Sequence, residues 1–339
     1  MTMILSDIIP IAIVGLFLFV IIRAGREPLW EEAYRRLGSN RQTMAAIVVM
    51  SLFIAIGILD SITVSVSNSG KPQTIVDVMF RGIPQERTYS EPMGTVTVGE
   101  PHPHELKHKH IFGTDGVGRD VFYNMLKGCR TAIIIGCLTQ LIAMPVALVL
   151  GMLAGYFGKL TDDLIQYAYT VLDSIPGVLL LIVIITVLSL KGQERGLLQI
   201  CTALGVTSWV QLCRLVRGET LKHRDRDYVR AARALGVSHG RILLRHILPN
   251  LLPILIITAT LGVSGNIISE TILTYLGVGV PPDIGSWGNM IDSARMELAR
   301  QPVIWWNFSV ASLAVLILVL CINIFGDALR DAVDPRLRS

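Results

Sequence analysis

Residues 227–250, DYVRAARALGVSHGRILLRHILPN, form the stretch that decides how this chain is organised. Val229–Leu235 favours a helix, and Gly236 suits the left-handed residue that commonly ends one. Ser238 can cap a second helix, and Pro249 marks where the next apolar run begins. We therefore expect a two-helix elbow whose alanines permit close approach and whose arginines favour an acidic partner. The alternative is a basic loop that only sets membrane topology.

The composition around this elbow is typical of a membrane protein. Hydrophobic residues make up 52% of the 339 residues and charged residues 17%, and the mean hydropathy is +0.56. A soluble domain carries about a quarter charged residues. The apolar residues also fall into runs of about 20, the length that spans the bilayer core. The net charge of +4 lies in short loops between these runs, so nucleic acid is not an expected partner. The composition predicts an all-α, polytopic transmembrane helical bundle in a lipid bilayer.

Seven apolar runs are candidates for membrane spans. The first, Ile8–Ile22, is short and contains Pro10, so it can be a retained span, an uncleaved signal anchor or an interfacial helix. We expect it to be an extra transmembrane helix within an N-terminal segment, residues 1–26. Six core spans are then expected at Met44–Val66, Thr131–Tyr156, Leu164–Leu190, Leu197–Leu215, Leu251–Tyr275 and Phe308–Phe325.

Basic residues in the connecting segments set the orientation. Lysines and arginines concentrate after the first apolar run, in the loop 216–249 and in the tail 329–339. The positive-inside rule places these segments in the cytoplasm. Residues 27–43 then predict a cytoplasmic amphipathic helix before the first core span, residues 44–66. The polar residues 67–130 predict an external segment.

That external segment contains one expected strand, at Thr95–Val98, and a glycine-rich stretch, HIFGTDGVGRDV, at residues 110–121. The stretch is similar to a phosphate-binding loop, but its order is G-x-x-G-x-G and no buried strand precedes it. A dinucleotide loop needs G-x-G-x-x-G between a strand and a helix. We instead expect Asp115, Arg119 and Asp120 to cap an interfacial helix, Arg119–Gly128, that leads into the next span.

No P-loop pattern, G-x-x-x-x-G-K-[ST], occurs in the sequence. Gly70-Lys71 is followed by proline and Gly158-Lys159 by leucine. Because that pattern holds the phosphates of ATP, we expect this chain to bind no nucleotide or other cofactor.

Polar residues inside apolar runs are the first candidates for a transport path. Asp173 lies about 13 Å beyond the start of its expected span, and Pro176 can kink the helix one turn later. Asn266 and Glu270 are one turn apart on one helix face. All four residues are candidates for the path or its gate, and hydrogen bonds between helices are the alternative role.

Four histidines, His102, His104, His108 and His110, crowd the stretch PHPHELKHKH. Imidazoles at this density can bind Zn²⁺ or Ni²⁺. The interleaved lysines repel a cation, however, and the histidines lack a fixed helical spacing. We therefore expect an exposed hydrophilic loop without a metal.

The elbow resembles the E-A-A motif of permease subunits in ABC importers, which reads E-A-A, three residues, G, nine residues, I, any residue, L-P. The matching positions are Arg230, Ala231, Ala232, Gly236, Leu248 and Pro249. Arg230 replaces the glutamate of the motif, and His246 replaces its isoleucine.

Further stretches extend the likeness over residues 29–338. They include LGSNRQTM at 37–44, FGTDGVGRD at 112–120, RHILPN at 245–250, SETILTYLGVGVPPDIGSWG at 269–288 and FGDALRDAVDPRLR at 325–338. Together they resemble the dipeptide/oligopeptide/nickel permease family, in its second-subunit, C-type form.

The resemblance implies a type I ABC importer permease fold, with residues 131–328 as the core permease domain. It implies a binding-protein-dependent importer of peptides in the bacterial inner membrane, and a chain that is not an enzyme. The implied partners are a second homologous permease subunit, two ABC ATPase subunits that hydrolyse ATP, and an extracytoplasmic solute-binding protein. The residues that this likeness assigns to ATPase coupling are Arg230, Ala231, Ala232, Gly236, Arg241, Arg245 and Pro249.

Three alternatives stay open at this point. The same architecture can import nickel, an oligosaccharide or another small solute. An intramembrane metal-dependent enzyme would need paired catalytic groups inside the spans, and the sequence has no such spacing. A secondary transporter usually shows inverted internal repeats, and we find none.

Overall fold

The structure is a computed structural model of the chain, and it describes residues 35–66, 72–99, 102–189 and 196–333. The transmembrane helix expected within residues 1–26 lies outside the described residues. So does most of the amphipathic helix expected at residues 27–43, of which residues 35–39 are helical. Leu37 in this piece is buried in a cluster with Ile257 and Leu329.

Long helices dominate the described residues. They are α3 (Arg41–Leu59), α5 (Val121–Phe157), α8 (Leu197–Arg224), α11 (Leu248–Tyr275) and α13 (Trp306–Val333). The shorter elements are α4 (Ile75–Met79), α6 (Lys159–Asp173), α7 (Gly177–Ser189), α9 (Asp227–Ala234), α10 (His239–Arg241), the π-helix η1 (Ile242–Ile247) and α12 (Trp287–Glu297). One antiparallel hairpin pairs β1 (Thr63–Val66) with β2 (Pro72–Thr74).

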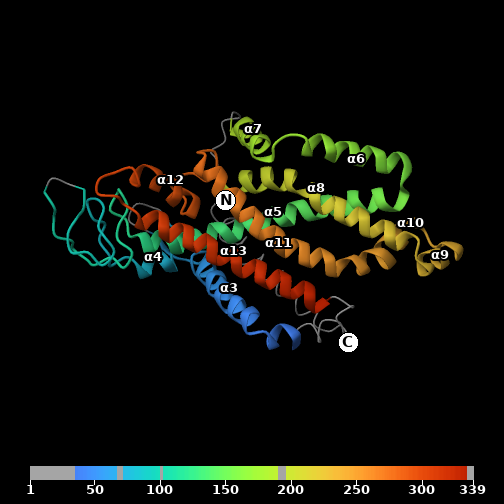
Figure 1. Cartoon of the computed structure of the whole chain (residues 1–339), viewed down its shortest axis with the longest axis horizontal. Coiled ribbons are helices and arrows are strands. Elements are labelled where there is room, and N and C mark those ends of the chain that lie inside the picture. The colour runs from blue at the N-terminus through green and yellow to red at the C-terminus, as the bar shows by residue number, and fades with distance from the viewer. Residues whose placement is uncertain (1–34, 67–71, 100–101, 190–195, 334–339) are drawn as a thin grey trace.

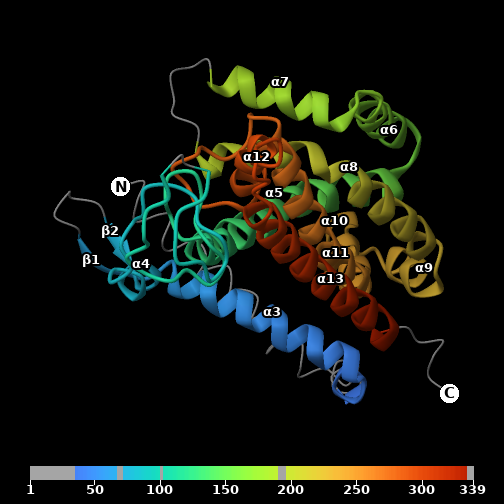
Figure 2. The same cartoon turned by 60° about the vertical axis from the view of Figure 1, so that its left-hand side comes forward.

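The two ends of the bundle differ in kind. Loops, the hairpin, α4 and α12 gather at one end, and the elbow of α9 and α10 projects from the other (Figure 1). In a second view α6 and α7 lie along one side of the bundle and α3 along the opposite side (Figure 2). The segment expected outside and the elbow expected inside therefore lie at opposite ends.

Four helical segments of the described chain are long and apolar enough to cross a membrane, and α6 with α7 makes a fifth if the bent pair is one span. The four are Arg41–Leu59, Val121–Phe157, His239–Tyr275 and Trp306–Ala332. The span expected at Leu197–Leu215 forms the first part of α8. This helix is not apolar enough to be counted among the four candidate spans. It packs along α5, so part of its surface faces protein.

Glycines of α5 and α8 bring these two helices into close contact. A methyl group on Gly151 would lie 2.7 Å from Cβ of Val216, and one on Gly155 the same distance from Cβ of Thr220. A methyl group on Gly205 of α8 would meet Ile142 at 2.6 Å. Small residues at such spacing let helix backbones approach closely within a membrane.

The first core span and the expected external strand differ from the prediction. The expected span Met44–Val66 is helical only to Leu59, and its last residues, Thr63–Val66, form β1. Their β-branched side chains suit a strand. Thr95–Val98 forms no strand, because Val96 and Thr97 make only isolated bridges.

Helix α5 is longer than predicted at its start. The expected interfacial helix Arg119–Gly128 and the span Thr131–Tyr156 form one continuous helix, since no helix-breaking residue separates them. Asp120 caps this helix as predicted, and its carboxylate accepts a hydrogen bond from the Tyr123 N–H at 3.0 Å. Asp115 accepts from the N–H groups of Val117 and Arg119 in the preceding turn.

Three further boundaries also move. The expected span Leu164–Leu190 is broken, because α6 ends at Asp173 and α7 begins at Gly177, directly after Pro176. The angle between the two helices is 87°. Helix α8 continues to Arg224, so the elbow begins later than the expected loop boundary at residue 216. Helix α13 continues to Val333, into the expected tail 329–339.

A charged cluster fastens α3, α4 and α5 together at the loop-rich end. The Lys127 ammonium lies 2.7 Å from Asp60 Oδ1 and 3.0 Å from Asp77 Oδ1. Burial raises the pKa of the Asp60 carboxyl, and the charge of Lys127 opposes this rise. Burial also acts to raise the pKa of Asp77, but hydrogen bonds from the Thr74 N–H and the Tyr123 hydroxyl leave it lowered. Lys127 therefore joins the two carboxylates, one of α4 and one at the end of α3, to α5.

Replacing this lysine tests the cluster. Lys127→Met leaves Asp60 and Asp77 without their cation, and loss of one partner of a buried ion pair costs about 3–5 kcal/mol. We expect the Tm in detergent to fall by about 5 to 10 °C. Lys222→Met is the matched control, because Lys222 also pairs with a carboxylate, Glu219, but is 68% exposed. An equal Tm for both variants would contradict this role of Lys127.

Candidate functional site

The elbow turns at a helix end that only glycine adopts easily. Gly236 has φ of +75°. The Val237 N–H donates to the Ala232 carbonyl at 3.1 Å, and the Gly236 N–H donates to the Arg233 carbonyl at 3.0 Å. This pair of bonds is a Schellman motif, which satisfies the last carbonyls of α9. The predicted left-handed end is therefore present at Gly236.

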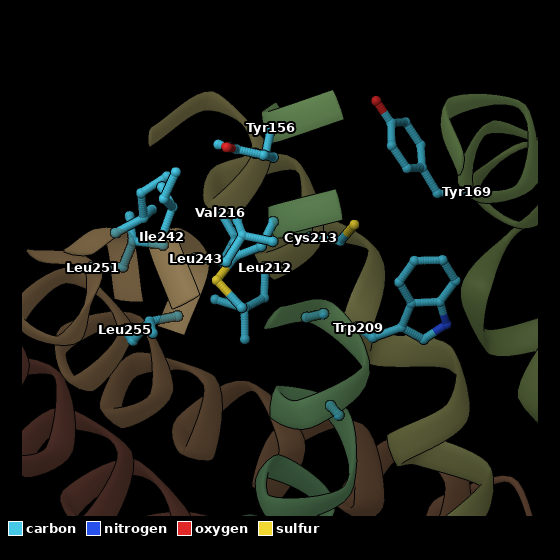
Figure 3. Packing of buried hydrophobic residues seen from close by; sticks show 14 of the residues in the cluster. Tyr156, Tyr169, Trp209, Leu212, Cys213, Val216, Ile242, Leu243, Leu251 and Leu255 are labelled. Atoms are coloured by element: carbon cyan, nitrogen blue, oxygen red, sulfur yellow. The ribbon is translucent and has the colours of Figure 1, made fainter. Parts of the chain in front are cut away.

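The inner face of the elbow is part of the protein core. Val229 and Ala232 of α9 are buried with Ile242 and Ile247 of η1. Figure 3 shows Ile242 and Leu243 packed beside Val216 and Leu251. Ser238 stands before α10, but its side chain makes no capping hydrogen bond, so that part of the prediction is wrong. Apolar packing orients the second arm, which runs through η1 into α11 without a break.

The outer face of the elbow is basic with an apolar tip. Leu235 is 83% exposed and Leu244 is 64% exposed. Most residues assigned to coupling by the resemblance are exposed with them, and these are Arg230, Ala231, Gly236, Arg241, Arg245 and Pro249. Ala232 is buried and supports the elbow from within. Sequence reasoning missed the two leucines, since an isolated leucine is usually assigned to the core.

A cavity of about 490 Å³ with both polar and apolar lining lies between α5, α8, α11 and the break between α6 and α7. It brings together three of the four residues predicted for the path, Asp173, Pro176 and Asn266. Its further polar lining was not predicted and consists of Gln140, Thr207, Ser208, Gln211, Thr258 and Ser269. Uncharged amides and hydroxyls are common on helices, so only the tertiary structure picks these out.

An ion pair stands at the break between α6 and α7. Asp173 Oδ2 lies 2.8 Å from Arg214 Nη2 of α8, and the two side chains are 48% and 43% exposed. The Arg214 guanidinium also lies over the Tyr169 ring, 4.8 Å from its centroid. A second pair, Asp162 with Arg217 at 2.7 Å, joins the start of α6 to α8. Both arginines hold α6 to α8, whereas α7, after the bend, packs against α8 through Leu181 and Ile185.

Asn266 and Glu270 have separate roles despite sharing a helix face. Asn266 lines the cavity, and its amide also donates to the Gly136 carbonyl of α5 at 3.2 Å. Glu270 does not line this cavity, so its assignment to the path stays a prediction without support from the cavity. Its carboxylate is buried and accepts hydrogen bonds from the hydroxyls of Thr274 at 2.9 Å and Ser286 at 2.7 Å. Glu270 therefore anchors the loop that leads from α11 to α12.

The histidines do not form a common site. His104 contacts Arg87 at 3.0 Å, and the buried His110 Nδ1 lies 2.7 Å from Asp120 Oδ2. Within the part of the chain that the structure describes, no three His, Cys, Asp or Glu side chains are grouped so that they could hold a metal ion. His110 instead connects the external segment to the capping residue of α5.

The glycine-rich loop has a packing role. Gly118 has φ of +75°, and a methyl group there would lie 2.0 Å from the Glu86 carbonyl oxygen. A methyl group on Gly113 would lie 2.3 Å from the Ser90 carbonyl oxygen. Gly113 and Gly118 thus let this loop pack closely against the backbone of Ser90 and Glu86. The phosphate-loop interpretation does not apply.

Comparison with known proteins identifies the family. Residues 147–339 match the family of binding-protein-dependent transport system inner membrane components. The chain belongs to this family. It is a multi-pass membrane component of a transport system and not an enzyme.

Individual relatives agree with this assignment. The chain is 30% identical to an oligopeptide transport system permease protein of Bacillus subtilis, over 91% of this chain and 90% of the relative. It is 35% identical to a putative peptide permease protein of Brucella suis, over 67% and 74%. It is 29% identical to a dipeptide transport system permease protein of Alkalihalophilus pseudofirmus, over 91% of each.

A solved structure shares the fold. A chain of the MetNI methionine ABC transporter, crystallised in inward-facing conformations, superposes with a TM-score of 0.52 at 19% identity. The match covers 63% of this chain and 98% of that chain. The helical bundle therefore has the type I ABC importer permease fold, as predicted.

The anchoring role of Glu270 in this permease can be tested. Glu270→Ala leaves the buried hydroxyls of Thr274 and Ser286 without their acceptor, at a cost of about 1–3 kcal/mol. We expect a Tm several degrees lower, while Asp283→Ala, an exposed change in the same loop, leaves the Tm unchanged. A Glu270→Ala variant with unchanged Tm but lost transport would instead put this residue in the path.

Proposed function

We propose that this chain is one of two permease subunits of an ATP-driven importer of peptides in the bacterial inner membrane. One observation carries the proposal. The chain has an exposed coupling elbow and a cavity lined in part by polar side chains, and two helices that bound this cavity, α8 and α11, lead into and out of the elbow. The names of the relatives, which are oligopeptide and dipeptide permeases, support peptides as the solute.

The elbow is suited to a separate ATPase subunit. Its tip offers Leu235 and Leu244 to an apolar groove, and its arginines fit an acidic rim around that groove. The sequence has no P-loop, so ATP is hydrolysed by partner chains and this chain binds no cofactor. Two such ATPases would serve the two permease subunits.

The cavity is suited to uncharged polar groups such as peptide bonds. Amides at Gln140, Gln211 and Asn266 can donate to carbonyls and accept from N–H groups. A second, homologous permease subunit would supply the facing wall. A solute-binding protein would deliver the peptide at the loop-rich end. Nickel is disfavoured as the cargo, because the lining contains no histidine or cysteine and its single carboxylate, Asp173, is paired with Arg214.

The break between α6 and α7 is suited to a gate. Pro176 has no N–H to continue the helix, so the chain can bend at this position between α6 and α7. The Asp173–Arg214 pair is half exposed, and such pairs contribute about 0–1 kcal/mol. A contact of this strength can open and close during each transport cycle.

Affinity purification from the native membrane tests the proposed assembly. The tagged wild-type chain is expected to recover an ABC ATPase and a homologous permease. Gly236→Val should abolish ATPase recovery without loss of membrane insertion, because a β-branched residue cannot easily adopt φ of +75°. Gly240→Val, on the same elbow but without a positive φ, should retain the ATPase. Peptide uptake by the wild-type chain alone, independent of ATP, would overturn the proposal.

The gate is tested by comparing two ion pairs of α6. Asp173→Asn should change uptake of radiolabelled trialanine by the intact transporter severalfold, with little change in Tm. Asp162→Asn removes the more buried, two-pronged pair with Arg217 and should lower the Tm instead. Unchanged uptake in Asp173→Asn would remove the ion pair from the gate.

A further inference from the structure

One residue of α5 contacts both arms of the elbow. Tyr156 is the penultimate residue of α5 and is only 4% exposed. Its hydroxyl lies 2.8 Å from Nδ1 of His239, at the start of α10. The guanidinium of Arg233, in α9, lies over its ring at 5.3 Å from the centroid. Figure 3 shows this tyrosine beside Val216 of α8, at the edge of the buried cluster.

The helix end that carries Tyr156 is bound to α8. Gly151 and Gly155 bring it against Val216 and Thr220, so this end of α5 and the adjoining end of α8 form one tightly packed unit. Helix α8 leads directly into the elbow, whereas the end of α5 reaches it through two rings, Tyr156 and Phe157, that contact His239, and of these only Tyr156 also hydrogen-bonds to it. Tyr156 thus connects the elbow to α5, a helix that is not adjacent to the elbow in the sequence.

The same helix has a weak point between Tyr156 and the cavity. Pro145 lies inside α5 and cannot donate to the carbonyl one turn earlier. Helices commonly bend at such a position. Gln140, on the far side of Pro145, lines the cavity. A movement of the elbow that pulls on Tyr156 can therefore turn the end of α5 about Pro145 and reshape the cavity wall.

From this geometry we infer that Tyr156 is a positioning residue for energy coupling: its hydrogen bond to His239 makes the end of α5 move with the elbow. This inference rests on the proposed function, since it assumes that an ATPase moves the elbow. It goes beyond that proposal by separating docking, which uses the outer face of the elbow, from transmission, which uses the buried tyrosine behind it. Loss of the Tyr156 hydroxyl is expected to leave ATPase docking intact and to weaken transmission from the elbow to α5.

A cysteine in the cavity reports transmission without a known solute. Ser208 is exposed and lines the cavity, and four of the five native cysteines are buried while Cys137 is partly exposed. In the purified complex, Ser208→Cys is labelled with a maleimide in the presence and absence of ATP plus vanadate. Labelling of the same chain without Ser208→Cys is subtracted. The nucleotide-dependent change in labelling rate measures how strongly the ATPase controls the cavity.

Tyr156→Phe is then compared with wild type and with Tyr169→Phe. We expect Tyr156→Phe to reduce the nucleotide-dependent change about fivefold, the effect of one lost neutral hydrogen bond, with normal ATPase recovery. Tyr169→Phe is the control, because Tyr169 is buried in the same cluster, its hydroxyl makes no hydrogen bond within the described residues, and the phenylalanine keeps the ring over which Arg214 lies. It should behave as wild type.

A double-mutant cycle identifies the partner. His239→Phe keeps an aromatic ring but removes the nitrogen that faces the Tyr156 hydroxyl, and it should cause a similar loss. The double variant should lose no more than either single variant, because both changes remove the same interaction. The inference would be overturned if the losses of the two single variants multiply in the double variant. It would also be overturned if Tyr156→Phe responds to nucleotide like wild type, or if that variant no longer recovers the ATPase. A wild-type complex that lacks an ATPase or shows no nucleotide response would instead overturn the proposed function.

Discussion

The close contact between α5 and α8 is the constraint on which the rest of this permease depends. Within a bilayer, burying apolar side chains does not drive helices together, because lipid is as apolar as they are. Close packing of small residues supplies the attraction, and Gly151, Gly155 and Gly205 let the two helices touch. The elbow continues from α8, the cavity opens beside both helices, and α6 is tied to α8 by two arginines. A bulky residue in this contact would disturb all three.

Polar groups are used differently along the bundle. At the loop-rich end, the buried carboxylate of Asp60 is held by both Lys127 and Thr74, which ties α3 to α4 and α5. Beside the cavity, the Asp173–Arg214 pair is half exposed and therefore weak. The elbow has apolar residues on both faces, and among the described residues Leu235 and Leu244 on the outer face are exposed. The weak ion pair beside the cavity is consistent with the gate proposed at the break between α6 and α7.

Local signals in the sequence predicted local structure well. Gly236 ends its helix in the left-handed region, and Asp120 caps α5, because these conformations depend on one or two residues. Pro176 stands at a break in its helix, but nothing local sets the 87° angle between α6 and α7. The same limit explains why Asn266 and Glu270, one turn apart, were given one role. Whether a buried polar side chain faces a cavity or a neighbouring loop depends on what packs against it.

The sequence by itself determined that this is a helical membrane protein with a basic elbow of the importer-permease type. Hydropathy, the spacing of alanine, glycine and proline, and the absence of a P-loop all lie along the chain and need no contacts to be read. Only the tertiary structure decided which residues share the cavity, that Glu270 is an anchor, and that Tyr156 joins α5 to both arms of the elbow. Tyr156 and His239, for example, are 83 residues apart in sequence, so only the packing of helices brings them within hydrogen-bond distance.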